Sequence, residues 1–112
     1  MTLKEQIYAA LSALAGGAVF VDFAPPEIAA PYIVWSEVVD TPLNALSGIS
    51  AWNLRLQVDA YAVTRSECDA LADLAISALA ADPIKAICIS KQSFTEDAVG
   101  LKRTVVDFSI WH

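Results

Sequence analysis

The stretch WNLRLQVDAYAVTRSE, residues 52–67, decides the fold class. From Trp52 to Ala62 every second side chain is apolar, and this period of two indicates a half-buried β-strand. Thr64 and Glu67 follow as a capping box, in which each side chain can bond the other residue's backbone amide at the start of a helix. A strand therefore runs directly into a helix, and no catalytic motif interrupts the unit. The other face of the strand carries Asn53, Arg55, Gln57, Asp59 and Tyr61.

The chain before this unit predicts a helix and two strands. Apolar residues at helical spacing after Thr2 predict a helix over residues 3–15, which Gly16-Gly17 ends. Residues 19–23 are β-prone and closed by two prolines, so they form either an edge strand or an extended arm. Residues 31–39 mix β-branched and aromatic side chains and predict a stronger strand.

Residues 40–51 are predicted to be a long loop between two antiparallel strands, because they contain Asn44 and Gly48 as well as a proline. The loop is longer than a tight hairpin needs, and it holds apolar side chains that a solvated loop has no reason to carry. We therefore expect an assembly element that is mobile in the free subunit and ordered against a neighbour. Its candidate residues are Pro42, Leu43, Leu46 and Ile49.

The chain after residue 64 completes the fold prediction. A helix is expected over residues 65–81, and strands over 84–93 and 101–111 with a turn at 96–100. The prediction is one α+β domain, residues 1–112, with an antiparallel sheet of four to five strands and two helices packed on one face, in the order α-β-β-β-α-β-β. The buried stripe of the second helix is expected to be Cys68, Leu71, Ala72, Ala75 and Leu79.

Composition points to assembly and away from nucleic acid. Hydrophobic residues make up 56% of the chain, and the mean hydropathy is +0.50. The chain thus carries more apolar side chains than a monomer of this size easily buries. The 13 acidic and 7 basic residues give a net charge of -6. Direct binding to DNA or RNA is disfavoured, because that affinity comes largely from Lys and Arg. The same charge suits a wall past which DNA slides without sticking.

The sequence offers no catalytic, cofactor or metal site, and we expect a protein that is not an enzyme. His112 is the only histidine and is expected to be a mobile tail. Cys68 and Cys88 are expected to be small buried residues in a reducing compartment, since two cysteines make no disulfide framework. Residues 7–21 are apolar, but Gly16-Gly17 does not fit a signal peptide, and no stretch reaches the roughly 20 apolar residues of a membrane span.

The carboxylates are scattered and show no calcium-loop spacing. Asp69 and Asp73 share a helix face, where like charges repel unless a cation lies opposite, either Arg65 or a group from a neighbouring subunit. If the protein lines a channel, five acidic residues are candidates for lumen-facing or interface charge. They are Glu37, Asp40, Asp59, Glu96 and Asp97.

The tryptophans lie on predicted strands, where aromatic side chains belong to a core or an interface more often than to a ligand platform. An alternative function keeps them as a platform: a dimeric small-molecule-binding or enzymatic α+β domain with Trp35, Trp52 and Tyr61 lining a pocket. Arg55 and Asp59 are the only polar groups near enough in sequence to serve that pocket.

Taken together, four segments resemble the tail-completion, or tail-terminator, proteins of long-tailed bacteriophages. The resemblance covers nearly the whole chain and includes no catalytic fingerprint. Its segments are APYIVW at residues 30–35, LQVDAYA at 56–62, the helix over 65–79, and VDFSIW at 106–111.

The resemblance implies a small α+β subunit that forms a homo-oligomeric ring, commonly a hexamer, at the head-proximal end of the tail tube. Such a ring stops tube polymerisation and offers a surface to the head. The implied partners are copies of the chain, the tail-tube protein and the head connector protein, with no direct nucleic-acid or membrane contact. The implied location is the virion tail, after assembly in the host bacterial cytoplasm.

Overall fold

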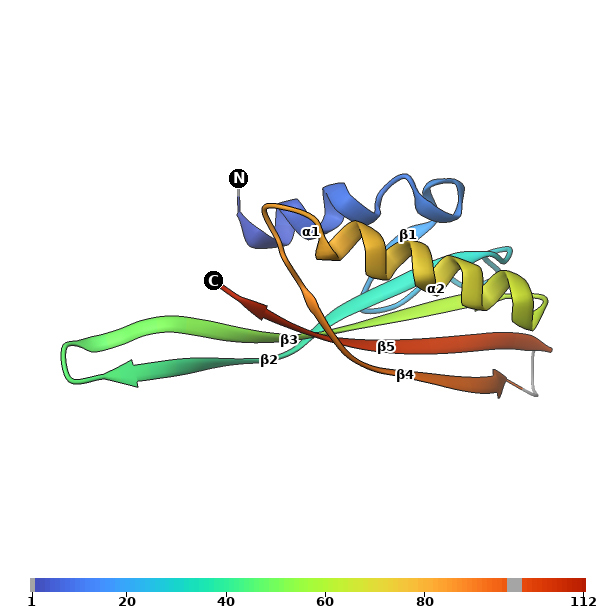
Figure 1. The fold of residues 1–112 in the computed structure, drawn as a ribbon. Coiled ribbons are helices and arrows are strands. Elements are labelled where there is room, and N and C mark those ends of the chain that lie inside the picture. Colours follow the sequence, from blue (N-terminus) through green and yellow to red (C-terminus); the bar gives the residue numbers. More distant parts are fainter. Residues whose placement is uncertain (1, 97–99) are drawn as a thin grey trace.

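The computed structural model describes residues 2–96 and 100–112 as a twisted sheet covered on one face by two helices (Figure 1). The α+β class and the order of helices and strands are confirmed. The predicted turn at 96–100 includes residues 97–99, which lie outside the described residues. In chain order the elements are α1 (Leu3–Leu11), the 3-10 helix η1 (Leu14–Gly17), β1 (Val19–Val21), β2 (Tyr32–Ala45), β3 (Gly48–Ala62), α2 (Arg65–Ala80), β4 (Ile87–Glu96) and β5 (Leu101–Trp111).

The five strands form one sheet in the order β1-β2-β3-β5-β4. β2, β3, β5 and β4 pair antiparallel, whereas β1 pairs parallel to β2, with Val19 beside Ile33 and Val21 beside Trp35. The prediction of an antiparallel sheet is therefore wrong at this edge. Residues 22–31 carry the chain back to the start of β2, which a parallel neighbour requires. Of the two alternatives for residues 19–23, the edge strand is correct.

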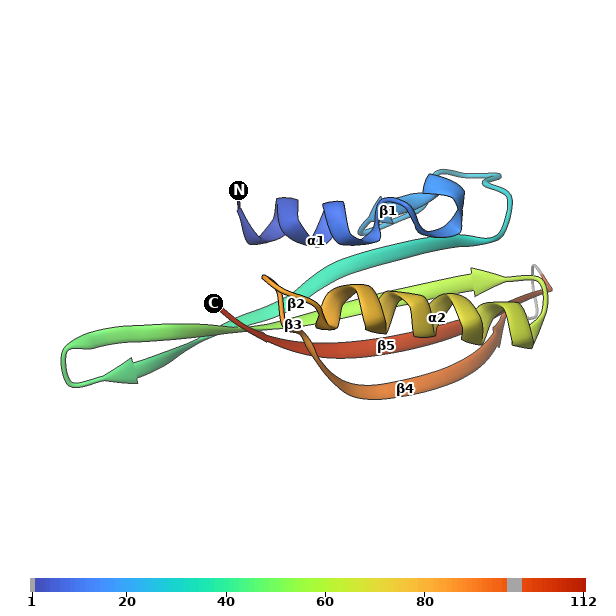
Figure 2. The same ribbon diagram turned by 45° about the horizontal axis from the view of Figure 1, so that its top comes forward.

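The alternation of side chains in β3 and β5 divides the sheet into two faces, as predicted. One face is buried under α1 and α2, which lie side by side on it (Figure 2). The opposite face, called the open face below, has no helix on it. The buried positions are Leu54, Leu56, Val58, Ala60 and Ala62 in β3 and Thr104, Val106, Phe108 and Ile110 in β5.

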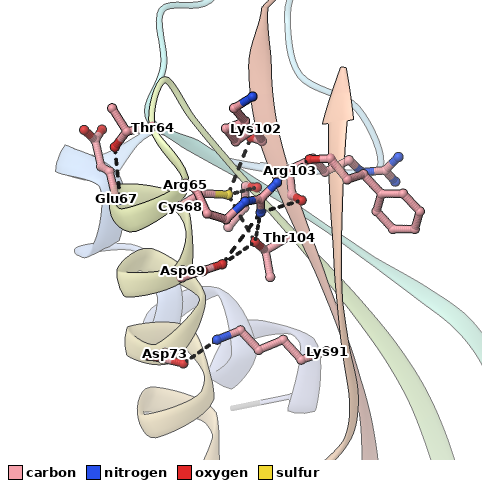
Figure 3. A network of polar contacts seen from close by, with 12 residues as sticks. Thr64, Arg65, Glu67, Cys68, Asp69, Asp73, Lys91, Lys102, Arg103 and Thr104 are labelled. Atoms are coloured by element: carbon pink, nitrogen blue, oxygen red, sulfur yellow. Dashed lines mark hydrogen bonds and ion pairs between the residues drawn. The ribbon is translucent and has the colours of Figure 1, made fainter. Parts of the chain in front are cut away.

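Helix α2 begins and packs as its sequence predicts. The Thr64 side chain accepts a hydrogen bond from the Glu67 backbone amide at 3.2 Å, which satisfies one of the free amides of the first turn (Figure 3). The predicted stripe is the buried one: Cys68, Leu71, Ala72, Ala75 and Leu79. Two of these five are alanine, which lets the helix lie close to the sheet.

Polar contacts join the exposed side of α2 to β5 and β4 (Figure 3). Arg65 lies 3.7 Å from the Asp69 carboxylate and donates to the Thr104 hydroxyl at 3.1 Å. Lys91 Nζ donates to the Asp73 carboxylate at 2.9 Å, and this hydrogen bond raises the pKa of Lys91 above its ordinary value. Both acidic residues are thus neutralised within the chain, and neither needs a cation from a neighbour.

Helix α1 is shorter than predicted. It ends at Leu11, not at residue 15, and η1 follows it. The Ser12 hydroxyl donates to the Ala9 carbonyl at 3.0 Å, a local bond that competes with the helix ladder. Left-handed backbone begins only at Ala15, with φ of 50°, and continues through Gly16-Gly17. The prediction that the glycines end this helix is therefore wrong, because the residue after Leu11 is still right-handed.

The two cysteines differ in environment. Cys68 is buried, and its thiol donates to the Ala60 carbonyl at 3.1 Å, as expected of a small core residue. Cys88 is exposed, so its predicted burial is wrong. It lies near the start of β4, the edge strand of the sheet, where the helix layer does not cover it.

Candidate assembly surface

β2 and β3 continue past the helices as a two-stranded projection, seen at the left of Figure 1. The predicted long loop over residues 40–51 is therefore wrong: β2 runs to Ala45, β3 begins at Gly48, and Leu46-Ser47 connects them. We call residues 38–52 the hairpin arm. It makes the molecule 52 Å long against 25 and 24 Å in the other directions.

Pro42 and Gly48, which indicated a loop in the sequence, are compatible with the hairpin. Trp52 uses both its backbone amide and its carbonyl on His112, at 2.9 and 3.0 Å, so its pairing with Pro42 on the other side involves no hydrogen bond. The missing amide of Pro42 therefore faces the free edge of β2, the one place where a sheet tolerates proline. Gly48, with φ of +119°, supplies the conformation that the turn requires.

The arm is apolar and exposed. The Leu46 side chain at its tip is fully open to solvent, at 112% of its reference accessibility. A bulge at Val38 marks the place where the arm leaves the body of the sheet. The predicted exposure of the assembly residues is correct although their secondary structure was not. The other large apolar side chains of the arm that are at least one-third exposed are Val38, Val39, Leu43, Ile49 and Trp52.

The end of the chain holds the base of the arm. His112 pairs with Trp52 through the backbone, and its Nε2 lies 3.0 Å from a carboxylate oxygen of Asp40. The expectation that His112 is a mobile tail is wrong, because the β5 register continues one residue past Trp111. The imidazole thus contacts the arm through Asp40 as well as through the backbone pairing.

A hollow of about 420 Å³ lies where the arm meets the open face. Val39, Leu43 and Trp111 are its exposed apolar walls. The polar groups of the hollow include Arg55 and the pair in which Asn53 Nδ2 donates to the Ser109 hydroxyl at 2.7 Å. We call it the Arg55 hollow. Thr41 and Pro42 complete the lining.

At the other end of the open face, one side chain from each strand joins a row across the sheet. Phe20 of β1 meets Tyr32 of β2 edge to face at 6.5 Å, and Tyr32 stacks on Tyr61 of β3 at 4.6 Å. The guanidinium of Arg103 in β5 lies 5.8 Å from the Tyr61 ring and 5.7 Å from the Phe94 ring of β4. This row ties together all five strands.

The five candidate channel charges separate in the structure. Glu37 and Asp40 are exposed at the start of the arm, and Asp40 has His112 as its partner. Asp59 is only 7% exposed, and it accepts a hydrogen bond from Arg103 at 2.7 Å. It is therefore not an open charge in the subunit. Glu96 is the last residue of β4, and Asp97 lies outside the described residues.

The aromatic pocket of the alternative function does not form. Trp35 is buried and pairs with Val58, so it faces the helices. Tyr61 lies on the open face, and Trp52 lies on the arm beyond the helix layer. Trp52 and Trp111 are exposed and so remain available for an interface, whereas Trp35 is core.

The described residues contain no group of three or more His, Cys, Asp or Glu side chains placed to hold a metal ion. Within the same residues, no helix combines the length and apolar character needed to cross a bilayer.

Sequence reasoning missed the Arg55 hollow, although a signal was available. Alternation in β5 puts Trp111 and Ser109 on the polar face, and the β3–β5 register sets them opposite Asn53 and Arg55. The sequence pattern could not assign Val39 to the hollow. Val39 lies on the open face only because the bulge at Val38 reverses the alternation of side chains along β2.

Comparison with known proteins gives a family and a fold. Residues 6–112 match the family model described as Tail completion protein gp17. A chain of the solved structure "Virion of native gene transfer agent (GTA) particle" superposes with a TM-score of 0.78, covering 97% of this chain and 92% of that chain. The two are 16% identical in sequence, so this likeness is one of fold. No curated protein sequence matches the chain.

Proposed function

The chain belongs to the Tail completion protein gp17 family, and from this premise we propose that it forms a ring at the head-proximal end of a phage tail tube. The ring would end tube polymerisation and give the head connector protein its joining surface. The match spans almost the whole chain, so the proposal concerns the entire domain.

The observation that carries this proposal is the hairpin arm. Its two strands leave the body with both outer edges largely unpaired and with apolar side chains in solvent. An exposed apolar surface of this kind is characteristic of an interaction site, and an arm reaches molecules that the compact body does not. A contact between two different patches of identical subunits closes into a ring when the rotation between neighbours is right. We propose six as the number of subunits, as the family resemblance implies.

The ring is tested by the mass of the purified protein in solution. We expect a closed oligomer of fixed size at about tens of micromolar, a range in which even weak association is visible. Light scattering coupled to size exclusion measures it, and electron microscopy of stained particles shows the shape. A 12.0 kDa species, both alone and mixed with assembled tail tubes, would contradict the ring. Removal of the gene from a phage that carries it should leave tubes of uncontrolled length without heads.

We also expect no binding to duplex DNA at moderate salt. The net charge of -6 repels phosphates, and the 7 basic side chains include four already paired with carboxylates, at Asp69, Asp73, Asp59 and Asp82. A gel shift with low-micromolar protein, beside a basic DNA-binding protein as control, makes the measurement. A shift that weakens as salt rises would contradict the prediction, because that dependence reports phosphate contacts.

A further inference from the structure

The Arg55 hollow presents a charge without a partner in the described part of the chain. Arg55 is exposed, and it makes no ion pair with any of the described residues. Beside it stand the apolar walls formed by Val39, Leu43 and Trp111, each about half exposed. A hollow with apolar walls and a guanidinium fits a segment that carries an apolar side chain close to a carboxylate, since arginine binds carboxylates through a planar fork.

The connection between β1 and β2 has that composition. In residues 22–28, DFAPPEI, Phe23 is 76% exposed and Ile28 is also exposed. Asp22 and Glu27 are exposed and form no ion pair among the described residues. Two prolines between them restrict the backbone, so little conformational entropy is lost when the segment docks. We call residues 22–28 the acidic loop.

The loop does not fill the hollow of its own subunit. Phe23 lines a separate hollow on the open face, together with Tyr32 and Val34. Val34 and Val39 are five positions apart on β2, which is roughly 16 Å along a strand. Asp22 is also held in place, because its amide donates to the Trp35 carbonyl at 2.9 Å.

We propose that the acidic loop of a second copy of this chain docks into the Arg55 hollow, with Phe23 against the apolar walls and Asp22 or Glu27 on the Arg55 guanidinium. The proposal rests on the self-assembly proposed above and names the surfaces that carry it. The two patches are complementary in charge and in apolar character, and their charges have no ion-pair partner among the described residues of one subunit. Because they are different patches, each subunit offers one of each, and the contact repeats from copy to copy.

Charge reversal at either patch tests the contact. Arg55→Glu alters only the hollow, and the double change Asp22→Asn with Glu27→Lys alters only the loop; asparagine tolerates the positive φ of 69° at position 22. We expect each variant to need about tenfold more protein for half-assembly, on the scale of a close interfacial charge pair. Lys85→Glu and Asp82→Lys are matched controls, because these exposed side chains pair with each other at 3.3 Å away from both patches.

Mixing the two variants is the decisive step. In an alternating assembly, the unchanged loop of one variant meets the unchanged hollow of the other. At the remaining contacts both patches carry reversed charges, so they attract each other again. Light scattering should then show assembly restored toward the wild-type level, with melting temperatures unchanged throughout. Loss of assembly in each variant without rescue on mixing would mean that the patches bind another partner, such as the tail tube, and would overturn the proposal.

The outcomes separate this inference from the proposed function. A wild-type ring that survives Arg55→Glu overturns the contact and leaves the ring standing. A wild-type chain that stays monomeric, alone and with tail tubes, overturns the ring and this contact together. Should Arg55→Glu unfold the subunit, Arg55→Gln removes the charge with less change and is judged by the same assembly measurement.

Discussion

Replacing Leu43 and Leu46 by serine is expected to abolish assembly at concentrations where the wild type is fully assembled, while the melting temperature changes by no more than about 3 °C. Both side chains stand at least half in solvent on the hairpin arm, so the folded monomer loses little burial when they are shortened. A few residues carry most of the binding energy of an interface. Leu46, at the tip of the arm, is the most exposed large apolar side chain of the described residues. Light scattering and thermal unfolding make the two measurements.

The matched control is Leu74→Ser. Leu74 is about half exposed on α2, away from the arm, so the same chemical change should affect neither assembly nor melting. The prediction would be contradicted by a double variant that unfolds, since that would place the two leucines in the core. It would equally be contradicted by normal rings and normal tail joining, because the arm would then have no part in assembly.

The largest effect on stability is expected from Phe108→Ala. Phe108 is completely buried under the helices, and truncation of such a ring removes about 3–5 kcal/mol of unfolding free energy. Small domains have only about 5–15 kcal/mol in total, so the variant should melt far lower or fail to fold. Chemical denaturation followed by circular dichroism gives the difference.

Trp111→Ala is the control for this core prediction. Trp111 lies on the same strand, but it faces the open side and is 54% exposed. Its loss should cost about 1 kcal/mol or less in unfolding free energy. A large loss for Trp111 together with a small one for Phe108 would show that the register of β5 is reversed.

The body of the fold could be predicted from sequence because its signals are local. Period-two alternation identified β3 and β5, and the capping residue Thr64 located the start of α2 to the residue. The arm could not be predicted in the same way. In the sequence, Pro42 and Gly48 indicate a loop. Only the tertiary structure shows that Pro42 faces the free edge of β2 and that Gly48 lies at the turn of a hairpin.

The candidate surface was predicted in part. The exposure of Leu43, Leu46 and Ile49 could be predicted from the turn residues around them, whether the segment forms a loop or two strands. The Arg55 hollow depends on the bulge at Val38, and the pattern of side chains in the sequence does not indicate this bulge. The ion pair between Asp59 and Arg103 joins positions 44 residues apart, so the burial of Asp59 could not be read from its place in a polar alternation.

The length of the hairpin arm is restricted by its strand structure. The arm is continuous with β2 and β3, so its reach of about 25 Å beyond Val38 is set by the number of residues in the strands. Adding one residue to each strand would turn every later side chain to the opposite face. A relative with a longer or shorter arm should therefore differ by an even number of residues in each strand. The length of the arm would then change in steps of about 7 Å, the rise of two strand residues.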